Sequence, residues 1–304
     1  MNLDETAVGH LLRMQDVIPV MERALADFSS GRVVQPTRVM LPVAEHQGFL
    51  GLMPAYTGTA LGTKLVAFYP HNTDVPTHHA TILLFKPETG EPLATMDGRL
   101  ITEVRTAAVS AVATERLAKP NASVLGIIGS GVQARSHLEA LRLVRDFGEV
   151  RVWSPNRSVE LAREHGVHAA ASAEEAVQGA DVVVTATTSQ TPVLCGEWLS
   201  PGVHINAVGA PRPDWRELDD EVLRRARVYV DSREAALKES GDVIAAGRIF
   251  AEVGEVVAGT KPGRQSAEEV TLFKSLGLAV EDVATAELIY RKALNESPST
   301  NPSS

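Results

Sequence analysis

The chain has 304 residues, 44% of them hydrophobic and 22% charged, which is the composition of an ordinary soluble globular protein. It carries 29 lysines and arginines against 38 aspartates and glutamates, so its formal net charge is −9. A surface of that sign repels phosphate groups, and we therefore expect no nucleic acid and no anionic membrane among its partners.

The cysteine content and the hydropathy of the chain limit the cellular locations that we expect. The single cysteine, Cys195, excludes an intramolecular disulfide and any multi-cysteine metal site. The first residues include acids where a signal peptide needs an apolar core, and no stretch has the roughly 20 apolar residues that span a bilayer. These features predict a reducing, cytoplasmic location.

The first part of the chain predicts an α+β domain with a mainly antiparallel sheet. Short strand-like runs are separated by Gly, Pro and Asn turns, which is the pattern of such a domain. The predicted strands cover residues 38–43, 48–53, 63–68, 80–85 and 92–96.

From Val124 onward, short β-rich runs alternate with amphipathic stretches. This alternation predicts an α/β domain, a parallel sheet of about five or six strands covered by helices, of the Rossmann type. The predicted strands cover residues 124–128, 150–153, 181–185, 203–208 and 227–230, and the predicted helices cover residues 132–147, 158–165 and 173–177.

We therefore divide the chain into two domains. Residues 1–118 form a substrate-binding and dimerisation domain, and residues 119–274 form the dinucleotide-binding domain. A last helix, at about residues 276–294, is long enough to return to the first domain, so we assign residues 275–304 to that domain. Beyond Asn295 the polar, Pro- and Ser-rich tail is expected to be disordered.

A glycine-rich turn marks the expected cofactor site. Gly129-Ser-Gly-Val-Gln-Ala134 matches the pattern in which glycines let the backbone approach a pyrophosphate at a helix N-terminus. Such a motif alone is weak, because glycine turns of this form occur by chance. Here it follows a predicted strand and opens a predicted helix, so we interpret it as a dinucleotide-binding loop.

The end of the second strand of that domain selects between cofactors. An acid there would bind the ribose of NAD, but this chain reads Trp153-Ser-Pro-Asn-Arg157 and has no acid. Arg157 can pair with a 2′-phosphate, although it could also be an ordinary exposed loop arginine. The sequence favours NADPH (NADP) over NADH.

Three cations of the first domain are candidates for a substrate site: Arg38, Lys64 and Arg105. Taken singly, each could be a solvated charge, as most lysines and arginines are. Lys64 is the exception, because its apolar neighbours predict a buried strand and a buried ammonium needs a partner or a function. His78 and His79, neighbours on one strand, point to opposite faces and predict packing or hydrogen bonding, and we expect no metal site.

Several longer runs resemble the ornithine cyclodeaminase and mu-crystallin family, and most strongly its mu-crystallin branch, the NADPH-dependent ketimine reductases. The resemblance covers the chain from about Pro19 to Leu294. The runs that carry it are residues 105–111, 129–134, 205–219, 230–242 and 273–282.

The resemblance implies a homodimer and a shared role for the three cations. In the family, the residues that match Arg38, Lys64 and Arg105 surround the substrate carboxylate, and Lys64 is the best candidate to supply a proton, with water as the alternative donor. The resemblance and the glycine loop together predict the cofactor-binding residues Gly129, Ser130, Gly131, Val132, Gln133, Ser154, Asn156, Arg157, Thr187, Val208, Thr106, His78 and Ser275.

The implied activity is the NADPH-dependent reduction of cyclic ketimine carboxylates, such as Δ1-piperideine-2-carboxylate or Δ1-pyrroline-2-carboxylate, to cyclic amino acids. Two positions argue against ornithine cyclodeaminase, because Gly51 and Pro211 stand where that branch carries acids. An alanine-type amino acid dehydrogenase, ornithine cyclodeaminase itself and a non-enzymatic thyroid hormone binder remain as alternatives.

Overall fold

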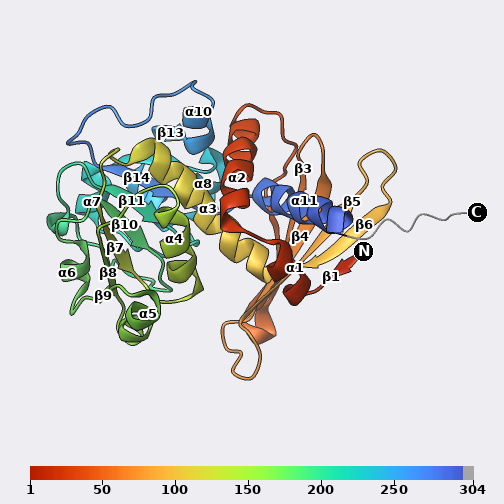
Figure 1. Cartoon of the computed structure of the whole chain (residues 1–304), viewed down its shortest axis with the longest axis horizontal. Helices are drawn as coiled ribbons and strands as arrows, with labels where there is room; N and C mark the ends of the chain where they lie inside the picture. The colour runs from red at the N-terminus through yellow and green to blue at the C-terminus, as the bar shows by residue number, and fades with distance from the viewer. Residues whose placement is uncertain (297–304) are drawn as a thin grey trace, which may run out of the picture. The chain divides into compact units, whose positions relative to one another are not determined.

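The computed structural model describes residues 1–296 and divides the chain into two compact units (Figure 1). Unit 1 consists of residues 1–24, residues 31–105 and the segment that begins at Ala279. Unit 2 consists of residues 25–30 and 106–278. The predicted disordered tail lies outside the described residues from position 297 onward. No helix within residues 1–296 is long and apolar enough to cross a bilayer.

Unit 1 contains a six-stranded sheet in the order β1-β6-β5-β4-β3-β2. Strands β2 to β6 pair antiparallel, as predicted, and the two-residue strand β1 adds parallel to β6. The strands are β1 (Asn2–Leu3), β2 (Val39–Val43), β3 (Gly48–Tyr56), β4 (Leu61–Phe68), β5 (His78–Phe85) and β6 (Pro92–Asp97).

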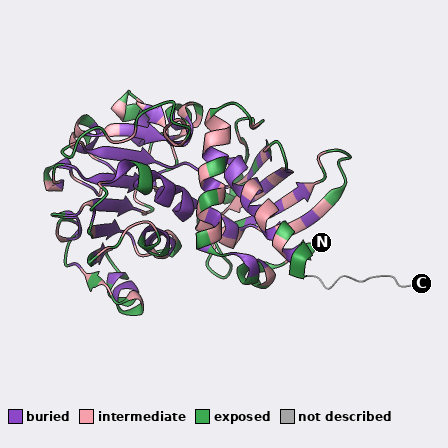
Figure 2. Ribbon diagram, turned by 45° about the horizontal axis from the view of Figure 1, so that its top comes forward, coloured by how far each residue is buried: buried purple, intermediate pink, exposed green. Residues whose placement is uncertain are grey.

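One face of this sheet is covered by the C-terminal helix α11 (Ala279–Glu296), which contacts β3, β4 and β5 (Figure 1). Buried and half-buried residues alternate along β4, as the two-residue period of a strand requires (Figure 2). A Cβ built on Gly62 would come within 3.2 Å of Val283 of α11, so the buried face of β4 is the face that α11 covers. Lys64 lies two residues further along β4 on the same face.

The remaining helices that begin in unit 1 were not predicted. They are α1 (Glu5–Leu11), α2 (Met14–Ser29), α3 (Arg99–Leu117) and the 3₁₀ turn η1 (Ala44–His46). The division between the units falls within α3, between Arg105 and Thr106, and not at the predicted position after residue 118. Later α3 residues are tied into unit 2, since the Ser110 hydroxyl bonds His137 and Thr114 accepts from Asn206.

Unit 2 contains an eight-stranded, fully parallel sheet in the order β13-β12-β14-β11-β10-β7-β8-β9. The order reverses between β7 and β10, which is the switch point of a doubly wound fold. The strands are β7 (Val124–Ile128), β8 (Glu149–Trp153), β9 (His168–Ala169), β10 (Val182–Thr185), β11 (His204–Ala207), β12 (Arg227–Val230), β13 (Ala251–Glu252) and β14 (Thr271–Lys274).

Helices connect these strands, as parallel strands require. They are α4 (Val132–Arg142), α5 (Ser158–His165), α6 (Ala173–Val177), α7 (Asp220–Arg225), α8 (Arg233–Glu239), α9 (Gly241–Ala246), α10 (Val253–Val257) and the 3₁₀ turn η2 (Gly196–Trp198). The inner strands are buried along nearly their whole length (Figure 2), which explains their uninterrupted apolar sequence. The prediction of a Rossmann-type α/β fold is confirmed.

Two details of the predicted fold were wrong. The sheet of unit 2 has eight strands within residues 1–296 and not five or six, because β9 and β13 are only two residues long and β14 ends in a charged residue, Lys274. Helix α4 ends at Arg142 and not near Phe147. After it, Leu143 and Val144 donate to carbonyls three residues back, so the chain tightens into a turn.

Candidate active site

Two cations and two carboxylates form a buried charge cluster in unit 1: Lys64, Arg105, Glu281 and Asp282. Lys64 Nζ lies 2.6 Å from Asp282 Oδ2. Arg105 donates from Nε to Asp282 Oδ1 at 2.9 Å and from Nη1 to Glu281 Oε2 at 2.8 Å. Lys64 is 2% exposed and Arg105 5%, and both carboxylates are fully buried. The structure therefore brings together two of the three predicted cations.

Three elements position this cluster. Lys64 points inward from β4, Arg105 lies on α3, and the two acids occupy the first turn of α11. Carboxylates in a first turn are favoured by the positive end of the helix dipole. A residue outside α11 also holds this turn in place, because the Val280 N–H donates to the side chain of Gln35 at 2.8 Å.

Burial lowers the pKa of Lys64 to about 8, and the charges of Arg105 and Arg38 act in the same direction, while Asp282 opposes the shift. For Asp282 the balance is different. Burial alone would raise its pKa, but Arg105 and Lys64 outweigh that penalty, and the net pKa is lowered. Asp282 is therefore an anion at neutral pH, and Lys64 titrates within reach of physiological conditions.

Arg38 and His78 are coupled electrostatically to this cluster. Arg38 is half-buried in the extended segment before β2, and its charge acts on Lys64. His78 begins β5, and burial together with the charges of Lys64 and Arg105 lowers its pKa to about 4. The His78 imidazole is therefore neutral at pH 7.

Sequence reasoning did not single out Glu281 and Asp282 as site residues. They fall at the end of the run 273–282, which was used only to support the family resemblance. A signal was present, since two adjacent acids interrupt an otherwise apolar helix start, Leu276 to Val283. Adjacent buried acids need partners, and the partners come from strands and helices about 180 to 220 residues earlier.

The glycine-rich loop of unit 2 has the geometry expected of a dinucleotide-binding turn. It follows β7 at the switch point of the sheet and leads directly into α4. Gly129 has φ +128°, and a Cβ there would lie 2.3 Å from the Ala186 carbonyl oxygen, so only glycine fits. Among residues 1–296, a Cβ on Gly131 would meet nothing within 4 Å, and no side chain caps the first turn of α4. Open space faces free N–H groups there, as a pyrophosphate requires.

Other predicted cofactor residues lie at the same edge of this sheet. Thr187, Val208 and Ser275 follow the carboxyl ends of β10, β11 and β14, and parallel strands end together. The buried Ser275 Oγ and Gln133 Oε1 have no hydrogen-bond partner in the described part of the chain. Polar atoms buried without partners are costly, so both fit a site completed by a ligand.

The loop after β8 carries three more of the residues that were predicted to bind the cofactor. Ser154 donates its hydroxyl to Ser130 at 2.8 Å, which links this loop to the glycine turn. Asn156 and Arg157 are exposed, and within residues 1–296 the Arg157 guanidinium makes no hydrogen bond or ion pair. A cation that is held by no protein group is available to an incoming phosphate.

A buried carboxylate, Glu217, ties the loops after β10 and β11 together. Its Oε1 accepts from the Thr187 N–H at 2.8 Å and from the Thr187 hydroxyl at 2.7 Å. Its Oε2 accepts from the Thr185 hydroxyl at 2.9 Å and from the Gly209 N–H at 2.8 Å. Lys274 extends the network, donating to the Gly209 carbonyl and, at 3.0 Å, to Asp242. Glu217 was not predicted from sequence to belong to this site.

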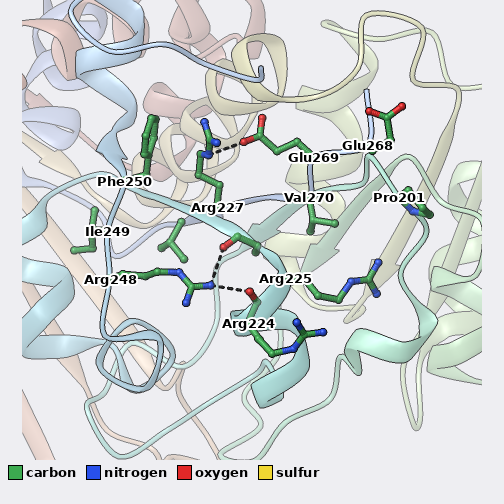
Figure 3. Close-up of a pocket in the computed structure, with 12 residues that line it drawn as sticks. Pro201, Arg224, Arg225, Arg227, Arg248, Ile249, Phe250, Glu268, Glu269 and Val270 are labelled. Atoms are coloured by element: carbon green, nitrogen blue, oxygen red, sulfur yellow. Dashed lines mark hydrogen bonds and ion pairs between the residues drawn. The ribbon is translucent and has the colours of Figure 1, made fainter. Parts of the chain in front are cut away.

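A pocket with a volume of about 670 Å³ lies at the amino ends of the strands of the same sheet. It is therefore not part of this site, which lies at their carboxyl ends. It is lined by residues just before β12 and β14, at their amino ends (Figure 3). Its arginines point in different directions. Arg248 and Arg225 bind backbone carbonyls at the ends of α7 and η2, and Arg227 pairs with Glu269. These arginines form hydrogen bonds to carbonyls at helix ends or an ion pair beside a strand. Their guanidinium groups do not converge on one ligand position.

Comparison with known proteins gives a consistent result. The model of the ornithine cyclodeaminase/mu-crystallin family matches residues 1–297. A ketimine reductase mu-crystallin of Mus musculus is 54% identical over 300 residues, which cover 94% of this chain and 95% of that protein. The structure of Thermococcus litoralis Δ1-pyrroline-2-carboxylate reductase in complex with NADH and L-proline has a TM-score of 0.92 at 42% identity, covering 97% of this chain and 98% of the other.

An archaeal alanine dehydrogenase dimer with bound NAD also has a TM-score of 0.92, at 39% identity, covering 97% of this chain and 96% of its own. The fold and the glycine loop thus define a protein of the Rossmann dinucleotide-binding class with a separate, cation-bearing α+β unit. The chain belongs to the ornithine cyclodeaminase/mu-crystallin family, and the predicted membership is confirmed.

Proposed function

We propose that the protein reduces cyclic ketimine carboxylates, such as Δ1-pyrroline-2-carboxylate and Δ1-piperideine-2-carboxylate, to cyclic amino acids with NADPH. The observation that carries this proposal is the buried charge cluster, in which a lysine with a pKa of about 8 lies beside an arginine. Imine reduction needs a proton for the nitrogen and positive charge for the carboxylate. The names of the 54% and 42% identical relatives support the same chemistry.

The residues divide this work between the two units. Arg38 and Arg105 supply guanidinium groups, which suit a planar carboxylate. Lys64, protonated below about pH 8, donates a proton to the imine nitrogen. In unit 2, the glycine loop and the first turn of α4 hold the dinucleotide phosphates. The bound dinucleotide supplies the hydride.

Gly51 argues against the cyclodeaminase alternative. A Cβ built there would lie 2.9 Å from Val66 and 3.2 Å from the Met40 sulfur, so the space that an acidic side chain would need is already filled. Pro211 likewise offers no acid to a second amine of the substrate. An alanine-type dehydrogenase remains the second candidate, because of the 39% identical archaeal neighbour. No observation favours thyroid hormone binding.

One set of assays separates these activities. We expect the protein to oxidise NADPH with Δ1-pyrroline-2-carboxylate or Δ1-piperideine-2-carboxylate. Pyruvate with ammonia should give a much lower kcat/KM, and ornithine should release no ammonia. If pyruvate with ammonia is the better substrate, the protein is an amino acid dehydrogenase and the proposal is wrong.

Arg157 should decide the choice of cofactor. We expect Arg157→Ala to weaken NADPH binding by about 1.5 to 3 kcal/mol, the usual value of a charged hydrogen bond, because it removes the pair with the 2′-phosphate. NADH binding should change little. Isothermal titration of both cofactors into both proteins measures this, with the exposed Arg163 changed to Ala as the control. Equal losses for NADPH and NADH would contradict NADP specificity.

We also propose a homodimer that uses the edge of the unit 1 sheet. Strand β2 carries large apolar side chains in solvent, with Val39 59% and Leu41 56% exposed, and Leu52 and Tyr56 of β3 are also exposed. Exposed apolar edge strands are typical of interaction sites. The archaeal neighbour is itself a dimer.

Sedimentation should show a dimer at micromolar concentration, and Leu41→Lys should shift it toward monomer. A wild-type protein that is an active monomer there would exclude this proposal.

A further inference from the structure

The carboxylate of Asp282 contacts two functional cations at once. Its Oδ2 lies 2.6 Å from Lys64 Nζ, and its Oδ1 accepts from Arg105 Nε at 2.9 Å. The carboxylate is fully buried and is held on the first turn of α11, so its two oxygens have fixed directions. One rigid anion therefore sets the relative position of the lysine and the arginine.

The other groups around Lys64 do not supply a second negative charge to it. The Thr102 hydroxyl lies 3.5 Å from Nζ and itself donates to a backbone carbonyl. Arg105 and Arg38 repel the ammonium, and His78 is neutral at pH 7 because its pKa is about 4. Glu281 contacts Arg105 and not Lys64. In the described residues, Asp282 is thus the carboxylate that favours the charged form of Lys64.

We propose that Asp282 is a positioning residue for the reduction: it keeps Lys64 as the ammonium ion that donates the proton and orients Arg105 toward the substrate carboxylate. The inference rests on the proposed function. A positioning role differs from a purely structural ion pair in one respect. It predicts that loss of the negative charge changes the titration of Lys64, and not only the stability of unit 1.

The first test needs no substrate. The pKa of Lys64 can be followed by NMR of lysine labelled at the ε-carbon in the cofactor-free protein, with Lys64→Met identifying the signal. We expect a pKa of about 8 in the wild type. In Asp282→Asn the acid dissociation constant of Lys64 should rise at least about tenfold, because burial and two arginines then act without opposition. Glu281→Gln should leave it within about twofold, since Glu281 does not contact Lys64.

The second test uses the pH profile of kcat/KM for NADPH and Δ1-pyrroline-2-carboxylate. In Asp282→Asn the alkaline limb should move to lower pH in parallel with the Lys64 pKa. Asp282→Glu keeps the charge with a longer side chain, so the limb should stay and kcat should fall. Asp16→Asn, which removes the exposed partner of Lys292, is the matched control and should change neither property.

Each outcome separates this inference from the proposed function. An unchanged Lys64 pKa in Asp282→Asn overturns the inference, whatever the activity. If Asp282→Asn does not fold, Asp282→Glu decides the question: a wild-type kcat in that variant would overturn the inference, because the carboxylate would then not need the position it has beside Lys64 and Arg105. A wild type that has the expected Lys64 titration but does not reduce cyclic imines contradicts the proposed function and leaves the role of Asp282 at Lys64 intact.

Discussion

Lys64→Met is expected to lower kcat for cyclic imine reduction about 100-fold or more, the usual contribution of a general acid. Methionine fills a volume similar to that of the lysine stem, so the change removes the proton donor without opening a large cavity. Steady-state NADPH oxidation measures the effect.

The protonation state of Lys64 determines the direction in which kcat/KM should change with pH. Lys64 is protonated below about pH 8, so the wild-type kcat/KM should be flat below that value and fall above it. In Lys64→Met this alkaline limb should be absent. A limb that belongs to the imine of the substrate would remain in both proteins, which separates the two sources.

Lys86→Met, which alters a half-exposed lysine after β5, is the control and should behave as the wild type. If Lys64→Met keeps a near-normal kcat and an unchanged pH profile, the proton comes from water, and Lys64 serves only the carboxylate. Asp282→Asn would then be expected to affect KM more than kcat.

The parts of the fold that were predicted from sequence are those specified locally. Strands β7 and β12 and helices α5 and α6 were predicted with the bounds that the structure shows, because short runs rich in β-branched residues predict inner parallel strands, and serine and acidic residues mark the start of a helix such as α5. The glycine loop was also predictable, since its glycine pattern is continuous in sequence and lies between a predicted strand and a predicted helix. Local structure that depends only on a few neighbouring residues can thus be obtained from sequence.

The charge cluster could be predicted only in part, because it depends on contacts between distant segments. An apolar strand with one lysine indicated that Lys64 is buried. Nothing near Lys64 in the sequence indicated which anion compensates it, since Asp282 lies 218 residues later. Burial is the largest cause of the lowered pKa of Lys64, and Asp282 opposes that shift.

Glu217 illustrates the same limit in unit 2. It sits in the loop before α7, and its four donors come from β10 and from the loops after β10 and β11. A Cβ on Gly209 would lie 2.4 Å from its Oε1, so the loop after β11 is built closely around the carboxylate. Glutamate is usually exposed, but Glu217 is fully buried and holds together the loops at which we propose that the cofactor binds.

Glu217→Gln replaces one oxygen by an NH₂ group, and it should nevertheless have a large effect on the stability of the protein. The carboxylate accepts two hydrogen bonds on each oxygen, and one of each pair comes from a backbone N–H, of Thr187 or of Gly209. However the glutamine amide is turned, its NH₂ group faces one of these N–H groups, and that donor is left buried and unsatisfied. The hydroxyls of Thr185 and Thr187 can rotate to adapt, but the backbone cannot.

We expect Glu217→Gln to lower the free energy of unfolding by about 2 to 4 kcal/mol, which corresponds to one unsatisfied backbone donor and one weakened hydroxyl bond in a buried site. Because Thr187 and Gly209 belong to the edge of the sheet at which we propose that the cofactor binds, KM for NADPH should rise about tenfold, equivalent to about 1.4 kcal/mol. Urea denaturation and steady-state kinetics measure the two effects. Glu268→Gln, at an exposed position of unit 2, is the control and should change neither. A Glu217→Gln protein with wild-type stability would mean that the loops after β10 and β11 hold their shape without this carboxylate.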